Sequence, residues 1–175
     1  MKIEIVKLTE KNLRNAPESC KYCIYWEYPE ECIGPEKEKK GEMLRKKLQW
    51  LRNTNKEFGN SGKILYVDGK PVGYAQYAPP KLLPNSANYK SKPSDDAVLI
   101  SCLFIPEKKY QRLALGGRLL QSIICDLRKR GIKAVETFAR KNKSENPSGP
   151  MKFYLNNGFR VYKDDKEFPL MRLEI

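Results

Sequence analysis

Histidine does not occur in this chain of 175 residues. Its absence excludes every site that depends on an imidazole, including histidine triads, histidine general bases and histidine metal ligands. The chain also lacks an apolar run near the roughly 20 residues that a membrane-spanning helix needs, so we expect no membrane partner. The first residues, from Met1 to Val6, carry no signal-peptide pattern, and we therefore expect a cytoplasmic protein.

Cysteine is scarce, with five residues at positions 20, 23, 32, 102 and 125, an odd number that cannot pair completely. Reduced thiols in a reducing compartment fit this pattern best. The Cys20-x-x-Cys23 spacing resembles that of zinc ligands, and Cys32 could be a third ligand. A structural zinc site needs four ligands, and no fourth cysteine occurs near these three in the sequence. A metal site, a redox pair and simply packed thiols all stay open.

Acidic residues are outnumbered, with 21 of them against 34 lysines and arginines, which gives a net charge of +13. Such a balance attracts polyanions, and a nucleic acid or a phosphate-rich cofactor would both satisfy it. The excess of positive charge is concentrated between Glu107 and Arg130, a stretch with seven basic residues and two acidic ones. A solvated basic surface with no dedicated partner is the alternative.

The most informative stretch begins with the apolar run from Ala97 to Ile105, which only Ser101 interrupts. Its length and composition predict a strand buried on both faces. The adjacent Gly116 and Gly117 follow, and the next segment has the spacing of an amphipathic helix that ends at Gly131. Its apolar positions are Leu115, Leu119, Leu120, Ile123, Ile124 and Leu127. A strand, a glycine-bearing turn and a helix N-terminus together make an anion-binding site.

The remaining elements follow from periodicity and turn chemistry. Further strands are predicted over residues 2–8, 63–67, 71–77, 133–139, 159–162 and 168–175, and helices from Thr9, over 35–52 and over 151–157. Asp68-Gly69 between two apolar runs is a strong hairpin signal. Residues 53–62 are expected to be a polar linker and 81–96 a long loop. The helix between strands 97–105 and 133–139 makes a crossover, so these two strands should be parallel.

Two motifs resemble a known family. Gln111-x-x-Ala114-x-Gly116 resembles the Gln/Arg-x-x-Gly-x-Gly/Ala signature of the GNAT N-acetyltransferase superfamily, with Ala114 in place of the first glycine. The segment from Phe153 to Phe159 resembles that family's Phe/Leu-Tyr-x-x-x-Gly-Phe segment. The resemblance covers residues 63–175 well and 9–60 poorly.

The resemblance implies an α/β (α+β) fold with a mixed, mostly antiparallel central sheet, a parallel βαβ unit and flanking helices. It implies one domain over 1–175, with 9–60 as a variable acceptor side and 97–159 as the cofactor-binding core. It further implies that acetyl-CoA is the co-substrate and that a primary amine attacks it directly. The implied cofactor contacts are Leu103, Phe104, Ile105, Gln111, Arg112, Leu113, Ala114, Leu115, Gly116, Gly117 and Asn146.

Tyr154 resembles the family tyrosine that protonates the departing thiolate. Glu27 and Glu107 are candidates for the general base, although neither has a sequence signature, and a water relay is a third candidate. The aromatic residues of 22–28 stand beside Glu27, Glu30 and Glu31, a combination that would suit a cationic amine. The same residues could instead cap the core.

The expected partner is therefore a small-molecule or peptide amine, and a homodimer stays open. Two rival interpretations use the same fold. One is a non-catalytic CoA-binding module, and the other is a nucleic-acid-binding protein, which the absence of an RNA-binding motif disfavours.

Overall fold

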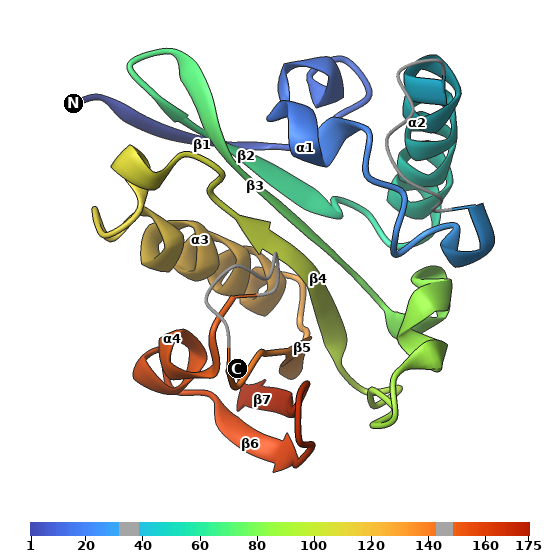
Figure 1. Ribbon diagram of the computed structural model, residues 1–175, viewed down its shortest axis with the longest axis vertical. Coiled ribbons are helices and arrows are strands. Elements are labelled where there is room, and N and C mark those ends of the chain that lie inside the picture. Colours follow the sequence, from blue (N-terminus) through green and yellow to red (C-terminus); the bar gives the residue numbers. More distant parts are fainter. Residues whose placement is uncertain (32–38, 143–148) are drawn as a thin grey trace.

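The computed structural model describes residues 1–31, 39–142 and 149–175. Its centre is a seven-stranded sheet in the order β1-β2-β3-β4-β5-β7-β6, shown in Figure 1. The strands are β1 (Ile3–Lys7), β2 (Gly62–Val67), β3 (Lys70–Ala78), β4 (Val98–Phe104), β5 (Ala134–Phe138), β6 (Arg160–Lys163) and β7 (Leu170–Glu174). Only β4 and β5 pair in parallel. The predicted fold class is confirmed.

Four α-helices accompany the sheet in the described part of the chain: α1 (Glu18–Lys21), α2 (Lys40–Glu57), α3 (Leu115–Lys129) and α4 (Met151–Asn156). The pleat of the strands sends alternate side chains to opposite faces. One face carries a core shared with α3 and α4, and the other carries a core shared with α1 and α2. None of these helices has the length and apolar character that crossing a bilayer requires.

The second half of the chain follows the sequence pattern closely. The hairpin between β2 and β3 turns at Asp68 and Gly69, whose φ angles of 49° and 79° are those of a two-residue hairpin turn. The helix α3, the parallel pair and the closing antiparallel strands are confirmed as well. Gly158, with φ of 86°, ends α4 as predicted.

Two predictions over the first 60 residues are wrong. The helix predicted from Thr9 is a short 3₁₀ turn over Leu13–Asn15, because Thr9 and Asn12 bond each other and close a local turn. The helix predicted over 35–52 continues to Glu57 and so includes the first half of the predicted 53–62 linker, since Thr54 extends its buried stripe. Its predicted start lies outside the described residues.

The strands β4 and β5 pair over only a short length. They pair at Val98 with Val135 and at Leu99 with Glu136. Beyond this point β4 runs on to Phe104 beside β3 alone, after an irregularity at Ser101 where the register with β3 shifts. The parallel pair therefore opens towards the end of β4, the end from which the chain leads into α3.

Candidate active site

The loop before α3 presents unpaired backbone donors. Arg112 and Ala114 adopt left-handed backbone, with φ of 66° and 57°. The Gln111 side chain donates to the Ile105 carbonyl at 2.9 Å and so anchors the loop to the end of β4. In the part of the chain that the structure describes, the N–H groups from Arg112 to Gly117 have no hydrogen-bond partner. Such a run at a helix N-terminus can bind a phosphate group.

The two sequence motifs meet in space at this helix start. A Cβ atom at Gly116 would lie 3.5 Å from the Phe153 ring and 3.9 Å from the Leu103 side chain. The Phe153 ring of α4 and the Leu103 side chain of β4 therefore lie within contact distance of a side chain at Gly116. Tyr154, the next residue of α4, is fully buried. The loop of unpaired amides and the tyrosine therefore lie next to each other.

Tyr154 lies in the core on the α3 and α4 face of the sheet, next to the point where β4 and β5 separate. Burial raises the pKa of its phenol above the ordinary value, and a hydrogen bond with the Thr137 side chain on β5 acts in the opposite direction. The Cys102 thiol on β4 is close enough to influence the same pKa. The phenol therefore stays protonated at neutral pH and can act as a proton donor.

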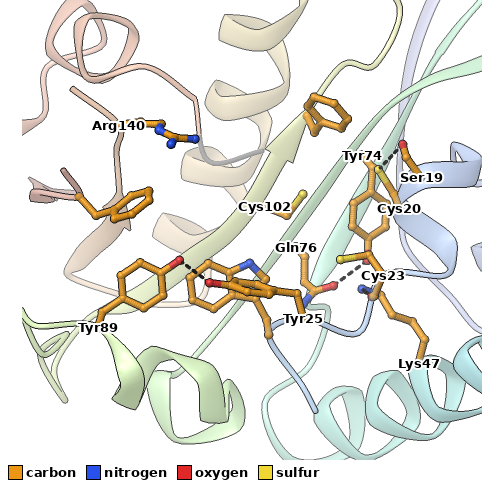
Figure 2. Close-up of a pocket in the computed structure, with 13 residues that line it drawn as sticks. Ser19, Cys20, Cys23, Tyr25, Lys47, Tyr74, Gln76, Tyr89, Cys102 and Arg140 are labelled. Carbon is orange, nitrogen blue, oxygen red and sulfur yellow. Dashed lines mark hydrogen bonds between the residues drawn. The ribbon is translucent and has the colours of Figure 1, made fainter. Parts of the chain in front are cut away.

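A pocket of about 320 Å³ lies on the α1 and α2 side of the same opening. Figure 2 shows Cys102 at its centre, between Arg140 and Lys47. Cys102 lines the pocket, and its thiol also influences the pKa of Tyr154 on the other face. The lining residues are Ser19, Cys20, Cys23, Tyr25, Trp26, Lys47, Tyr74, Gln76, Tyr89, Cys102, Phe104, Arg140 and Phe168.

A buried ion pair stands at the wall of this pocket. The Lys47 ammonium lies 2.8 Å from a Glu27 carboxylate oxygen and donates a hydrogen bond of 2.6 Å to the Cys23 carbonyl. Neither Glu27 oxygen has an aligned hydrogen-bond donor in the described chain. Burial lowers the pKa of Lys47, but the Glu27 carboxylate together with the Tyr74 and Cys23 side chains outweighs burial and holds that pKa above its ordinary value. The Lys47 ammonium is therefore charged at neutral pH.

No family model matches this chain, and no curated protein matches its sequence. Solved structures do match. The PaiA N-acetyltransferase from Thermoplasma acidophilum, in complex with coenzyme A, is 17% identical over 100% of both chains, with a TM-score of 0.65. An acetyltransferase of the GNAT family from Staphylococcus aureus is 14% identical over 99% of both chains, with a TM-score of 0.62. This chain has the GNAT fold.

A further structure of this kind is the ribosomal-protein-S18-alanine N-acetyltransferase from Escherichia coli. It is 17% identical, with 99% of this chain and 94% of that one covered and a TM-score of 0.56. At such identities the likeness establishes the GNAT fold alone, because one fold carries many activities.

The predicted cofactor residues occupy two faces of this GNAT fold. Leu103 and Ile105 point into the core beneath α3, whereas Phe104 lines the pocket on the other face. The residues from Gln111 to Ala114 are exposed, Leu115 is buried, and Gly116 and Gly117 are half-buried. Asn146 lies outside the described residues. These assignments to the cofactor stay predictions.

The two predicted general bases lie apart. Glu107 is on the surface, 2.7 Å from the Lys70 ammonium and 3.2 Å from that of Lys109. These partners hold the pKa of Glu107 below its ordinary value, which weakens it as a proton acceptor. Glu27 is fully buried against Lys47 and does not line the pocket. Both roles stay predictions, and the geometry favours neither carboxylate over water.

Cys20 and Cys23 are free thiols at the pocket, an arrangement that fits the packed-thiol alternative, while the predicted acidic residues do not line the pocket. Cys20 and Cys23 line the pocket together with Cys102, and no group of metal-ligand side chains occurs among the described residues. Cys32 lies outside them. Glu31 pairs with Lys46 away from the pocket. The aromatic rings and carboxylates that were expected to form one cation site are therefore separated.

Sequence reasoning missed Lys47, Gln76, Tyr89 and Arg140. A signal for Lys47 was present, because it continues the buried stripe of α2 from Met43 to Trp50 and Leu51. A lysine at a core position needs a buried partner. Tyr89 and Arg140 carried no comparable signal, since they lie in irregular segments.

Proposed function

We propose that this protein is an N-acetyltransferase that moves an acetyl group from acetyl-CoA to a primary amine by direct attack. The observation that carries the proposal is one juxtaposition at the end of β4. A loop of unpaired amides, a protonated tyrosine and a ligand-sized pocket converge where β4 parts from β5. The GNAT fold supports the same activity by analogy.

The loop supplies the binding energy for the cofactor. Its amides from Arg112 to Gly117 would take the pyrophosphate, and the Arg112 side chain would add positive charge. The thioester would then lie along the free edge of β4, from Leu103 to Ile105, where backbone N–H groups can polarise its carbonyl. Acetyl-CoA supplies the activated acetyl group, and no covalent acyl-enzyme is required.

The transfer itself needs few protein groups. The neutral amine nitrogen attacks the thioester carbonyl carbon, the new C–N bond forms, and the C–S bond breaks. The departing thiolate takes the proton of Tyr154, and the phenolate regains a proton from solvent. The nitrogen loses its own proton to water, because neither Glu27 nor Glu107 lines the pocket.

The test exploits Gly116, where a side chain meets only ordinary van der Waals contacts. Gly116→Asp places a carboxylate at the helix N-terminus, where it suits the helix dipole but repels a pyrophosphate. Gly116→Asn has nearly the same size without the charge. We expect Gly116→Asp to weaken acetyl-CoA binding about 100-fold or more, and Gly116→Asn to weaken it far less. Calorimetric titration of both variants measures the difference.

The turnover of amines by the wild-type protein completes the test. Mass spectrometry of an amine library incubated with acetyl-CoA should reveal N-acetylated products, which Gly116→Asp should not form. Equal acetyl-CoA affinity in the two variants would show that the loop is not part of the cofactor site. Tight acetyl-CoA binding without any acetylated amine would instead favour a non-catalytic CoA-binding module.

A further inference from the structure

The aromatic walls of the pocket hold one another in place. The Trp26 ring stacks on Tyr89 with centroids 5.3 Å apart, and Tyr25 meets Trp26 edge-on at 5.3 Å. The Tyr25 and Tyr89 hydroxyl groups lie 3.0 Å apart in a hydrogen bond, and Tyr89 stacks on Phe138 at 4.1 Å. Because each ring is fixed by another, the pocket is preformed and suits a flat apolar group.

The charged side chains that line the pocket are cations. Lys47 and Arg140 contribute to its wall, and no carboxylate of the described chain does. Glu27 lies fully buried behind Lys47, and Glu167, which contacts Arg140 at 3.3 Å, faces a different cavity. A substrate cation held inside would lose its hydration and meet no free anion.

Several of the ring faces that could hold a substrate cation are already in use. The Lys47 ammonium lies 5.5 Å from the centre of the Tyr74 ring, and the Arg140 guanidinium lies 5.4 Å from that of Phe168. Trp26 is stacked on Tyr89. The cation–π attraction that an aromatic pocket usually offers an amine is therefore reduced here.

Three side chains of the pocket offer hydrogen-bond donors. The Tyr74 hydroxyl donates to the side-chain oxygen of Gln76 at 2.8 Å, which fixes the orientation of that amide. The amide nitrogen of Gln76 is buried and has no acceptor in the described chain. Lys47 and Arg140 can only donate. An unpaired buried donor is costly, so a ligand with an acceptor oxygen would complete this site.

We infer that the acceptor of the proposed acetyl transfer is an amino acid with an aromatic side chain. The ring would lie between the fixed aromatic walls, and the carboxylate would accept from the pocket's donors, with Gln76, Lys47 and Arg140 as specificity determinants. The volume of about 320 Å³ suits a molecule of this size rather than a folded protein segment. This inference rests on the proposed acetyltransferase function and replaces the cationic amine expected from sequence.

Matched substrates test the inference. Phenylalanine and phenethylamine share the ring and the amine but differ in the carboxylate, and spermidine is a cation without a ring. We expect kcat/KM for phenylalanine to exceed that for phenethylamine roughly tenfold or more, because the unpaired donors reject a substrate without an acceptor. Spermidine should not be acetylated. A preference for phenethylamine or spermidine would overturn the inference.

A binding measurement tests this inference independently of whether the protein catalyses acetyl transfer. The probe is 3-phenylpropanoate, which has the ring and the carboxylate but no amine to acetylate. Trp26 lines the pocket, so its fluorescence reports occupancy in a Trp50→Phe background, which leaves Trp26 as the only tryptophan. We expect 3-phenylpropanoate to bind more tightly than phenethylamine. The reverse order, or no binding of 3-phenylpropanoate, would contradict the inference whatever the turnover assays show.

The variant Gln76→Glu provides a specificity control. It keeps an acceptor oxygen for the Tyr74 hydroxyl and changes little in shape, but it places a carboxylate in the pocket wall. We expect at least about tenfold weaker binding of 3-phenylpropanoate, because two carboxylates would meet. Binding of acetyl-CoA should not change. An unaltered dissociation constant for 3-phenylpropanoate, in a variant with the wild-type melting temperature, would show that Gln76 does not contact the ligand carboxylate and would contradict the inference.

Discussion

A residue with a side chain pays a free-energy penalty in the left-handed region, and the loop before α3 contains two such residues. Arg112 and Ala114 have φ of 66° and 57°. Ala114 stands where the GNAT signature has its first glycine, and it adopts the backbone conformation that glycine would adopt freely. The substitution therefore preserves the loop shape, and the unpaired amides remain in place.

Replacing Ala114 with glycine should stabilise the protein. Relief of the left-handed strain is worth roughly 1–2 kcal/mol, while the greater freedom of glycine in the unfolded chain offsets roughly 0.4–1 kcal/mol of it. We expect a net rise of about 0.5–1 kcal/mol in the free energy of unfolding, measured by urea denaturation. Ala114→Ser keeps a Cβ atom and should show no gain. A loss of stability in Ala114→Gly would mean that the strain is absent.

Tyr154→Phe isolates the proposed proton donor. The ring is fully buried, so phenylalanine keeps its packing and removes only the hydroxyl. We expect turnover to fall about 10²- to 10⁴-fold, the usual contribution of a general acid, with little change in acetyl-CoA affinity. Steady-state kinetics and calorimetry on the same preparation separate the two effects. Unchanged turnover would exclude Tyr154 from the chemistry.

At the scale of elements, the sequence predicts what depends on neighbours along the chain. The β2–β3 hairpin follows from Asp68-Gly69, and α3 follows from its apolar stripe and Gly131, because turn geometry and helical spacing are local. The pocket is not local. It joins Cys20 and Lys47 to Tyr89 and Arg140, and only tertiary packing brings such segments together. Motifs predicted a cofactor loop before α3, while the acceptor side had no motif.

One buried ion pair joins α2 to the segment before it. Lys47 and Glu27 are both buried, so removing one charge leaves the other uncompensated. We expect Lys47→Met to lower the free energy of unfolding by about 3–5 kcal/mol. The double variant Lys47→Met with Glu27→Gln should recover much of this loss, since no buried charge remains.

The neighbouring Lys46 supplies the matched control. It pairs with Glu31 and Glu42, whose side chains are about half exposed. Exposed pairs of this kind contribute roughly 0–1 kcal/mol, so Lys46→Met should change stability little. Equal losses from Lys46→Met and Lys47→Met in urea denaturation would contradict the special role of the buried pair.

At the scale of the whole molecule, the charge of +13 suits a polyanionic cofactor as well as a nucleic acid. The aromatic residues distinguish these partners. Proteins that bind single strands present rings for stacking on bases, whereas Trp26, Tyr74, Tyr77 and Tyr154 are buried here. Burial of these rings counts against the nucleic-acid interpretation and leaves the basic surface free to attract phosphates.

Buried and half-buried tyrosines also determine how the molecule responds to alkali. Burial raises the pKa of Tyr74, Tyr77, Tyr89 and Tyr154 above the ordinary value of 10. A group whose pKa is higher in the folded state stabilises the fold fully below its unfolded pKa, and this contribution is lost as the pH rises. The Lys47 ammonium, whose pKa is also raised, acts in the same direction. We therefore expect stability to fall above about pH 10.

Absorbance of tyrosinate measures this prediction directly. The chain has ten tyrosines, and those near the surface should ionise first, reversibly and with circular dichroism unchanged. The four phenols whose pKa burial raises should ionise only in a second step that coincides with loss of secondary structure, because burial disfavours the charged phenolate in the folded protein. A single smooth titration of all tyrosines with secondary structure intact would show that the cores around the pocket admit water far more readily than their packing implies.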